Sequence, residues 1–181
     1  FSYRVGIKKK DRKRVQMVFQ DPFSSLNPKI TIGEQIMEPM RIHGIGKNSA
    51  DRWSKAVQWM EKVGMPEPEQ SLYKYPHAFS GGQRQRIVIA RALAAEPECI
   101  ICDESVAALD VSVQAQVLNL LNQLKAELGL TFLFISHDLH VVRYMCDRVM
   151  IMQQGKIVEM GATEAVFQHP HHPYSQTLLS K

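Results

Sequence analysis

Two acidic residues follow a short apolar stretch in the middle of the chain, in the sequence Ile100-Ile101-Cys102-Asp103-Glu104. Such a stretch is typical of a buried strand, and α/β sheets bind ligands at the carboxyl ends of their strands. Asp103 is suited to hold Mg²⁺, which prefers one or two carboxylates together with phosphate oxygens and water. Glu104 could then polarise a water molecule for in-line attack on a phosphoryl group. The alternative is a strand end that carries two surface acids.

A second candidate is the sequence Ser80-Gly81-Gly82-Gln83, which has the pattern of a helix start. Ser80 fits the N-cap, and Gln83 three residues later completes a capping box. The two glycines leave room for a ligand close to the backbone, and the free N–H groups of a helix N-terminus attract phosphate. The alternative is a well-capped helix with no ligand.

Two further polar side chains come directly after predicted strands. Gln20 follows the apolar sequence at 14–19, and His137 follows the sequence at 131–136. Either residue alone would more often be structural. Because all these groups lie at strand ends or at a helix start, together they indicate a phosphate-binding site.

These groups need strands and helices to position them, and the hydrophobic pattern predicts both. Apolar sequences predict strands at 14–19, 99–102 and 131–136, with the last two buried. Helical spacing of apolar residues predicts helices within 32–64 (interrupted at 44–48), 81–95, 113–128 and 139–146. Residues 148–160 are expected to form a hairpin, and residues 65–77 a connector. Strands that alternate with helices predict a mostly parallel α/β sheet, here with an antiparallel edge.

The composition fits one globular domain and excludes several classes of protein. The 181 residues are 45% hydrophobic and 22% charged, which argues against a disordered tail, a collagen-like rod or a disulfide miniprotein. The sequence lacks an apolar stretch of the roughly 18 residues that span a bilayer, and it begins without a signal-peptide pattern. The net charge is +4, and the basic run at 8–14 has no interleaved aromatic residues. We therefore expect a solvated basic edge and no nucleic-acid partner.

The cysteines and the histidine-rich tail are weaker signals. Cys99 and Cys102 form a CxxC sequence, but they flank two isoleucines on a predicted strand, so we expect core packing rather than zinc or redox chemistry. With Cys146 they make an odd number, which favours reduced thiols. The histidines of residues 169–172 are interrupted by proline, which favours an exposed turn over a metal site.

With these groups in this order, the sequence resembles the nucleotide-binding subunit of an ABC transporter over essentially the whole chain. The motifs are a Q-loop (Gln20), a signature (Phe79 followed by Ser80 to Gln83), Walker B (100–104), a D-loop (107–110) and a switch histidine (His137). Within the family, residues 16–28 and 169–174 are most similar to ATPases of bacterial dipeptide and oligopeptide importers. Nickel importers share much of this pattern.

The resemblance implies an α/β fold, namely a partial RecA-like P-loop NTPase core with a mostly parallel sheet and an inserted α-helical subdomain. Residues 1–31 would be the end of the catalytic core with the Q-loop, and residues 32–78 the helical subdomain. Residues 79–161 would hold the signature helix and the rest of the core. Residues 162–181 would be a C-terminal extension with the HPY motif.

The resemblance also implies a role for each site residue. Asp103 and Gln20 would bind Mg²⁺, Glu104 would act as the general base, and His137 would contact the γ-phosphate of ATP. The signature residues Ser80, Gly81, Gly82 and Gln83 would grip ATP held by a second ATPase subunit, to which Asp110 would link His137. The helical subdomain would receive transmembrane permease subunits. The protein would then be peripheral, at the cytoplasmic face of the cell membrane.

The chain departs from the family pattern at several positions. Phe79, Ser105 and Ala107 stand where leucine, proline and serine are usual, although none of these changes removes a reactive group. The 181 residues also contain no GxxxxGK[ST] phosphate loop, because the glycine-rich sequence at 44–49 lacks both the earlier glycine and the final Ser or Thr. That loop would precede Gln20. We therefore expect a chain that begins inside the core and has no ATPase activity alone.

The sequence thus predicts an ATP-binding and ATP-hydrolysing subunit of an ABC importer that energises dipeptide or oligopeptide uptake. Two alternatives stay open at this point. One is a degenerate, non-catalytic ABC subunit or fragment that acts as an interaction module. The other is the ATPase of a nickel importer.

Overall fold

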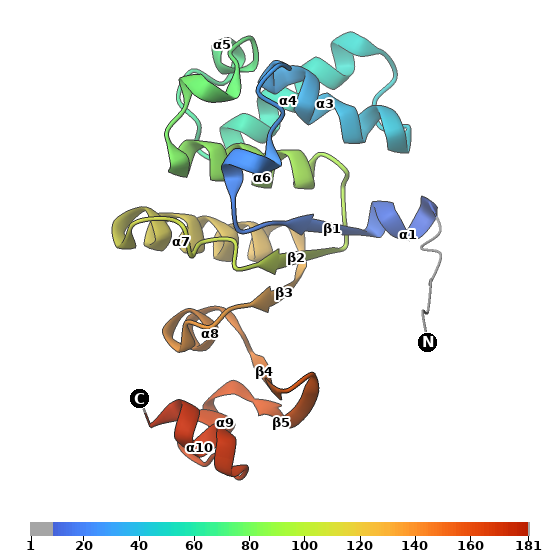
Figure 1. Cartoon of the computed structure of the whole chain (residues 1–181). Coiled ribbons are helices and arrows are strands. Elements are labelled where there is room, and N and C mark those ends of the chain that lie inside the picture. Colours follow the sequence, from blue (N-terminus) through green and yellow to red (C-terminus); the bar gives the residue numbers. More distant parts are fainter. Residues whose placement is uncertain (1–8, 181) are drawn as a thin grey trace. The chain divides into compact units, whose positions relative to one another are not determined.

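The structure is a computed structural model that describes residues 9–180, with side chains from residue 11 onward. Residues 1–8, which include Lys8 at the start of the basic run, therefore lie outside the described residues. The chain divides into two compact units, Phe1–Ile135 and Ser136–Lys181 (Figure 1). Each unit is described by itself.

The first unit is built on a parallel sheet of three strands in the order β1-β2-β3. The strands are β1 (Val15–Val18), β2 (Cys99–Asp103) and β3 (Thr131–Ile135), which confirms the three predicted strands. Val18 pairs with Cys102, and Asp103 pairs with Ile135. The three strands therefore end at the same edge of the sheet.

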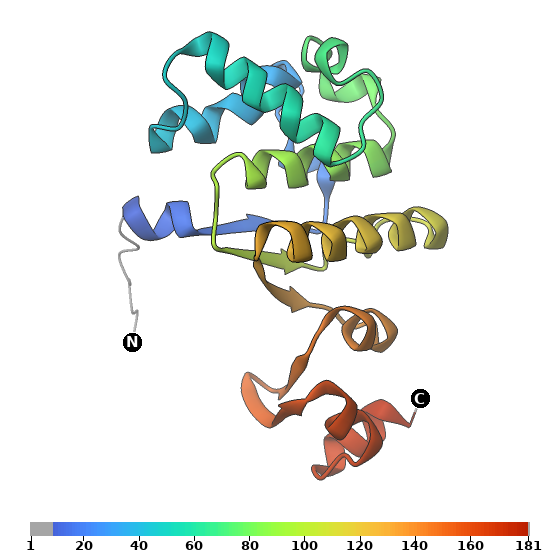
Figure 2. The same cartoon turned by 180° about the vertical axis from the view of Figure 1, so that it is seen from behind.

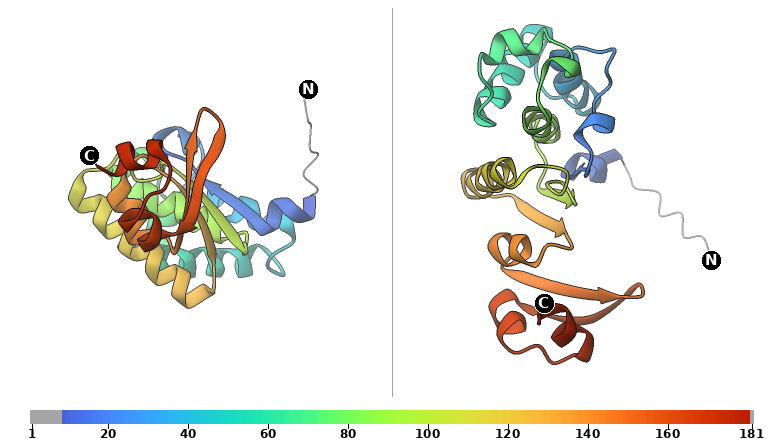
Figure 3. Two further views of the ribbon diagram at one scale, coloured as in Figure 1. Left: turned by 90° about the horizontal axis from the view of Figure 1, so that it is seen from below. Right: turned by 60° about the vertical axis from the view of Figure 1, so that its left-hand side comes forward.

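The two faces of this sheet differ in burial. One face, which includes Val18, Ile100 and Cys102, is buried beneath helices α6 (Gly81–Leu93) and α7 (Val111–Leu128), seen on one side of the strands in Figure 3. On the opposite face Leu133 is 40% exposed and Ile135 is 48% exposed. The prediction that residues 131–136 form a buried strand is therefore wrong, because the residues of β3 alternate between exposed and half-buried. The prediction that residues 99–102 form a fully buried strand holds only for Ile100 and Cys102, since Cys99 and Ile101 are half-buried.

A block of helices packs above the sheet through α6 (Figure 2). It contains α3 (Ile32–His43), α4 (Ser49–Lys62), α5 (Pro68–Leu72) and the 3-10 helix η1 (Pro76–Ala78). The side chains of Thr31 and Asn48 cap α3 and α4, and Gly44 ends α3 in the left-handed conformation that suits glycine. The apolar core residues of this block include Ile36, Met40, Met60 and Leu72.

The helix predictions for residues 32–64 are confirmed, but the connector at 65–77 is more ordered than expected. Pro68 and Pro76 start α5 and η1. Proline is favourable at a first helical position because its missing N–H would have no partner there. The prolines that suggested a loop therefore begin short helices.

Two further short helices flank β1. α1 (Lys9–Arg14) contains most of the basic run, and α2 (Pro22–Ser25) follows Gln20. Arg14 forms two hydrogen bonds with the Glu98 carboxylate, at 2.9 and 2.8 Å, and both side chains are exposed. The described end of the basic run is therefore a solvated edge, as expected, but it is helical.

The second unit contains α8 (Leu139–Met145), a hairpin of β4 (Arg148–Gln153) and β5 (Lys156–Ala162), and helices α9 (Thr163–Gln168) and α10 (Pro173–Leu179). The predicted hairpin is confirmed. In the described part of the chain it is a separate two-stranded sheet, not an antiparallel edge of the parallel sheet, which corrects that expectation. No helix among residues 9–180 is both long and apolar enough to cross a membrane.

Candidate functional site at the strand ends

Gln20 and Asp103 are held near each other by the register of β1 and β2. Asp103 is the last residue of β2, and Gln20 comes two residues after Val18, which pairs with Cys102. Gln20 is exposed and Asp103 is half-buried, so both side chains are accessible at this edge. An amide oxygen and a carboxylate are hard oxygen ligands, which is the donor type that Mg²⁺ prefers. The two residues therefore fit the predicted metal role.

Glu104 follows β2 in an unusual backbone conformation, with a φ of 46°. Its N–H donates to the Ile135 carbonyl at 2.9 Å, and its carbonyl accepts from the Ala107 N–H at 2.9 Å. A left-handed conformation is unfavourable for a residue with a long side chain, and such strain is concentrated at functional sites. A positive φ also occurs at Glu67, Glu96 and Gln154 in the described chain, so it does not by itself indicate a functional residue. At Glu104 it is relevant because this residue lies beside Asp103.

Ser105, one of the departures from the family pattern, is buried directly after Glu104. Its hydroxyl oxygen has no hydrogen-bond partner among the described residues. Nothing in the structure explains the presence of serine at this position.

The signature sequence forms the capped start of α6, as predicted. The Ser80 hydroxyl accepts from the Gln83 N–H at 3.4 Å, and the Gln83 side-chain oxygen accepts from the Ser80 N–H at 3.0 Å. The Gln83 side chain is thus engaged in the cap. A Cβ at Gly82 would overlap the Val113 side chain of α7, whereas a Cβ at Gly81 would meet nothing closer than 4.0 Å. Gly82 therefore allows α6 to approach α7, whereas a methyl group at Gly81 would make only ordinary contacts with Leu109 and Phe23.

Asp110 and His137 lie at the starts of two other helices. The Asp110 carboxylate accepts from the Val113 N–H at 3.0 Å and caps α7. His137 belongs to the second unit, in the turn between β3 and α8, where the Asp138 carboxylate accepts from the His140 N–H at 2.9 Å. The first unit therefore brings together Gln20, Asp103 and Glu104, whereas His137 is positioned by the second unit.

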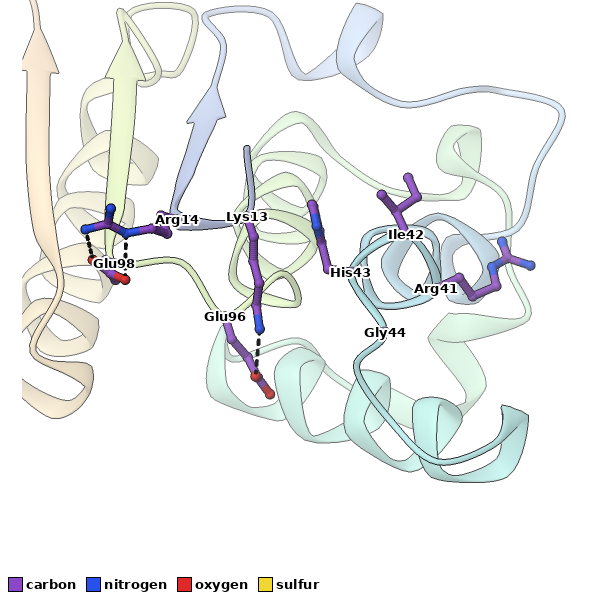
Figure 4. Close-up of a pocket in the computed structure, with 8 residues that line it drawn as sticks. All are labelled: Lys13, Arg14, Arg41, Ile42, His43, Gly44, Glu96 and Glu98. Carbon is purple, nitrogen blue, oxygen red and sulfur yellow. Dashed lines mark hydrogen bonds and ion pairs between the residues drawn. The ribbon is translucent and has the colours of Figure 1, made fainter. Parts of the chain in front are cut away.

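A pocket of about 730 Å³ lies at the other end of the sheet (Figure 4). It is lined by residues that precede β1 and β2 and by the end of α3, and it contains none of the predicted site residues. Lys13 pairs with Glu96 at 4.0 Å and Arg14 with Glu98 at 2.8 Å, so much of its charge is already neutralised. Because parallel sheets bind ligands at their carboxyl ends, we place the site at Gln20 and Asp103 instead.

The cysteines and the glycine-rich sequence at 44–49 behave as structural features. Cys102 is fully buried, Cys99 is half-buried, and burial raises the pKa of the Cys99 thiol. The glycine-rich sequence is the turn between α3 and α4, where Gly44 ends one helix and Asn48 caps the next. It does not have the role of a phosphate loop.

Sequence reasoning missed two residues beside the signature. The Arg84 guanidinium lies 4.1 Å from the centre of the Phe23 ring, and the position of a Cβ on Gly81 would be 4.0 Å from that ring. Phe23 and Arg84 are 61 positions apart in the chain, and no periodic pattern links them. Only the fold reveals this contact.

Known proteins are similar to this chain over most of its length. The family model for ABC transporters matches residues 3–107. A putative peptide import ATP-binding protein of Brucella ovis is 54% identical over 95% of this chain, and an oligopeptide transport ATP-binding protein of Streptococcus mutans is 53% identical over 93%. A glutathione import ATP-binding protein of Salmonella choleraesuis is 54% identical over 93% of the chain and is covered over 27% of its own length.

The chain spans about half the length of the first two relatives, 53% and 54%. Among solved structures, CbiO1 of Clostridium perfringens, part of an ABC transporter complex, superimposes with a TM-score of 0.75 at 28% identity. This match covers 88% of the chain and 61% of CbiO1. With its parallel sheet, its capped signature helix and these relatives, the chain belongs to the ABC transporter family.

Proposed function

We propose that this chain is the part of an ABC importer ATPase that carries the magnesium ligands and the water-activating carboxylate, and that the importer takes up peptides. The observation that carries the proposal is the placement of Gln20, Asp103 and Glu104 at the carboxyl ends of adjacent parallel strands. The relatives named for peptide, oligopeptide and glutathione import support the substrate class.

In this proposal each side chain has one task. Asp103 and Gln20 hold Mg²⁺, which when bound to ATP offsets the negative charge of the phosphates. Glu104 accepts a proton from water as the water oxygen attacks the γ-phosphorus and the bond to the bridging oxygen of ADP breaks. His137 contacts the γ-phosphate.

A second ATPase subunit completes the site. The N-terminus of α6 presents free N–H groups, and Gly81 carries no side chain beside them, so a phosphate could approach the backbone closely. Ser80, Gly81 and Gly82, with the Gln83 cap, would face ATP held by the other subunit. Asp110 would lie at the contact between the subunits.

The helical block offers a surface for the permease subunits. Tyr73 is 65% exposed, Tyr75 is 42% exposed, and Phe23 is 60% exposed at the border of the block. Exposed aromatic side chains are enriched in protein interfaces. Docking there would place the protein at the cytoplasmic face of the membrane.

The test of this function uses a hybrid protein in which an ABC phosphate-loop region precedes residues 1–181. Produced together with peptide permease subunits, the hybrid should support ATP-dependent peptide uptake. ATP hydrolysis without peptide uptake would refute the substrate class. No hydrolysis by an assembled hybrid would favour the non-catalytic interaction module.

The permease surface is tested in the same hybrid. Tyr73→Glu should reduce peptide uptake while ATP binding stays unchanged, because Tyr73 lies away from the strand ends. Tyr144→Glu is the matched control, since Tyr144 is similarly exposed but lies on α8 in the second unit. Equal uptake by the two variants would argue against this docking surface.

A further inference from the structure

The segment of residues 21–31, between Gln20 and α3, is fastened to α6 at two points. Arg91 donates from Nη1 to the Ser25 carbonyl at 2.6 Å, and Arg84 stacks on the Phe23 ring at 4.1 Å. Burial lowers the pKa of Arg91, and the nearby Glu38 carboxylate partly offsets this effect. Arg84 is itself held by donation from Nε to the Pro76 carbonyl at 2.8 Å.

The other end of the segment is fastened to α3 by Gln35, which is only 3% exposed. Its side-chain oxygen accepts from the Asn27 N–H at 2.8 Å. Its side-chain nitrogen donates to the carbonyls of Asn27 and Ile30, at 3.0 and 2.9 Å. Gln35 thus satisfies three backbone groups that a loop would otherwise leave to water.

Hydrogen bonds within the segment also stabilise its conformation. The Asp21 carboxylate accepts from the N–H groups of Phe23 and Ser24, at 2.8 and 3.2 Å, and starts α2. Within the described residues, the hydrogen bonds that leave residues 21–31 for other elements go to α3 and α6. The sheet is joined to this segment through the backbone of Phe19 and Gln20.

We propose that Arg91, together with Arg84 and Phe23, is a positioning residue that makes residues 21–31 move as one body with α6. Gln20 and the signature residues at the start of α6 then take up their positions together. Arg91 lies eleven residues after Ser80, roughly 16 Å along the helix axis, so it acts through α2 and not on a nucleotide. The attachment stands on the contacts alone, whereas its catalytic consequence rests on the proposed function.

Amide hydrogen exchange on the 181-residue chain tests the attachment directly. Arg91→Met should speed exchange of the Ser25 and Ile30 amides on the order of tenfold to a hundredfold, because a hydrogen bond from a charged donor is lost. Arg91→Lys should restore part of the protection, since lysine can donate one hydrogen bond to the same carbonyl.

Arg86→Met is the matched control. Arg86 lies on the same helix and donates to the Val63 carbonyl, after the end of α4, at 2.7 Å. Its loss should leave exchange at residues 23–30 unchanged. Equal exchange of that segment in Arg91→Met and in the unchanged chain would overturn the attachment.

The catalytic consequence is measured in the assembled hybrid. Arg91→Met should lower kcat for ATP hydrolysis at least about fivefold and change the KM for ATP less than about twofold, because misplacement costs rate more than binding. Arg91→Lys should recover part of kcat. An unchanged kcat would overturn this consequence, whereas a hybrid without any hydrolysis would refute the proposed function and leave the exchange result valid.

Discussion

Glu104 combines a carboxylate suited to activating water with a backbone conformation that is costly for any residue except glycine. The hydrogen bonds of its backbone to Ile135 and Ala107 hold that conformation between the end of β2 and the following turn. The sequence identified the carboxylate from its place after an apolar strand. The conformation could not be predicted, because it depends on β3, whose residues lie about thirty positions further along the chain.

The strain at Glu104 makes a prediction about stability. Glu104→Gly should be more stable to urea unfolding than Glu104→Ala by about 1 kcal/mol, because only glycine adopts a positive φ without steric cost. Asp103 lies in β2, where glycine weakens a strand, so Asp103→Ala should be more stable than Asp103→Gly. If Glu104→Ala proved as stable as Glu104→Gly, the backbone at this position would not be strained.

At the scale of elements, the contact between α6 and α7 depends on one glycine. Gly82→Ala should lower the free energy of unfolding by about 1–3 kcal/mol, because the new methyl group would overlap Val113. Gly81→Ala is the control: its methyl group has space, and alanine favours the helix by up to about 1 kcal/mol. Urea unfolding of both variants measures the difference. Equal effects would mean that α6 and α7 do not pack this closely.

A different contact holds the histidine-rich tail to β5. The backbone N–H groups of His171 and His172 donate to the Glu159 carboxylate at 2.9 and 3.1 Å. The His171 N–H has the largest effect and, together with Ser175 and the His172 N–H, lowers the pKa of Glu159 to about 2. The tail is therefore exposed, as expected, but fixed.

This contact predicts a dependence on pH. The Glu159 carboxylate binds protons less readily in the folded chain than in the unfolded chain, so its stabilising effect is complete above pH 4.5 and is lost as the pH falls towards 2. Carboxyl NMR should give a midpoint near 2 for Glu159, and Glu159→Gln should remove this share of the acid destabilisation. A midpoint near 4.5 would show that the tail is not held by this carboxylate.

Most elements could be predicted from hydrophobic period and caps, because strands 99–103 and 131–135 and helices 32–43, 49–62 and 81–93 depend on local sequence. The exposure of Leu133 could not be predicted, because the burial of a strand residue depends on which other elements cover that face of the sheet. The helices of residues 68–72 and 76–78 were missed because proline suggested only a break. The contacts of Arg91 and Arg84 with α2 join residues more than sixty positions apart, which no local pattern encodes.

At the scale of the whole molecule, the described chain offers two surfaces of different character. The open sheet face exposes Val15, Leu133 and Ile135 beside the half-buried Asp103, and the helical block exposes Tyr73 and Tyr75. Exposed apolar surface of this kind favours association with other protein. Such surfaces fit the partners of the proposed function, which are a second ATPase subunit and permease subunits.

The central claim is that Glu104 activates the water that hydrolyses ATP, and single-turnover hydrolysis by the hybrid tests it most directly. Glu104→Gln should bind Mg-ATP within about threefold of the unchanged hybrid, because glutamine keeps the size of the side chain. Its rate of γ-phosphate release should fall by roughly a hundredfold or more, because the amide cannot accept the proton of water. Release by Glu104→Gln at a rate within a few-fold of the unchanged hybrid would contradict the claim.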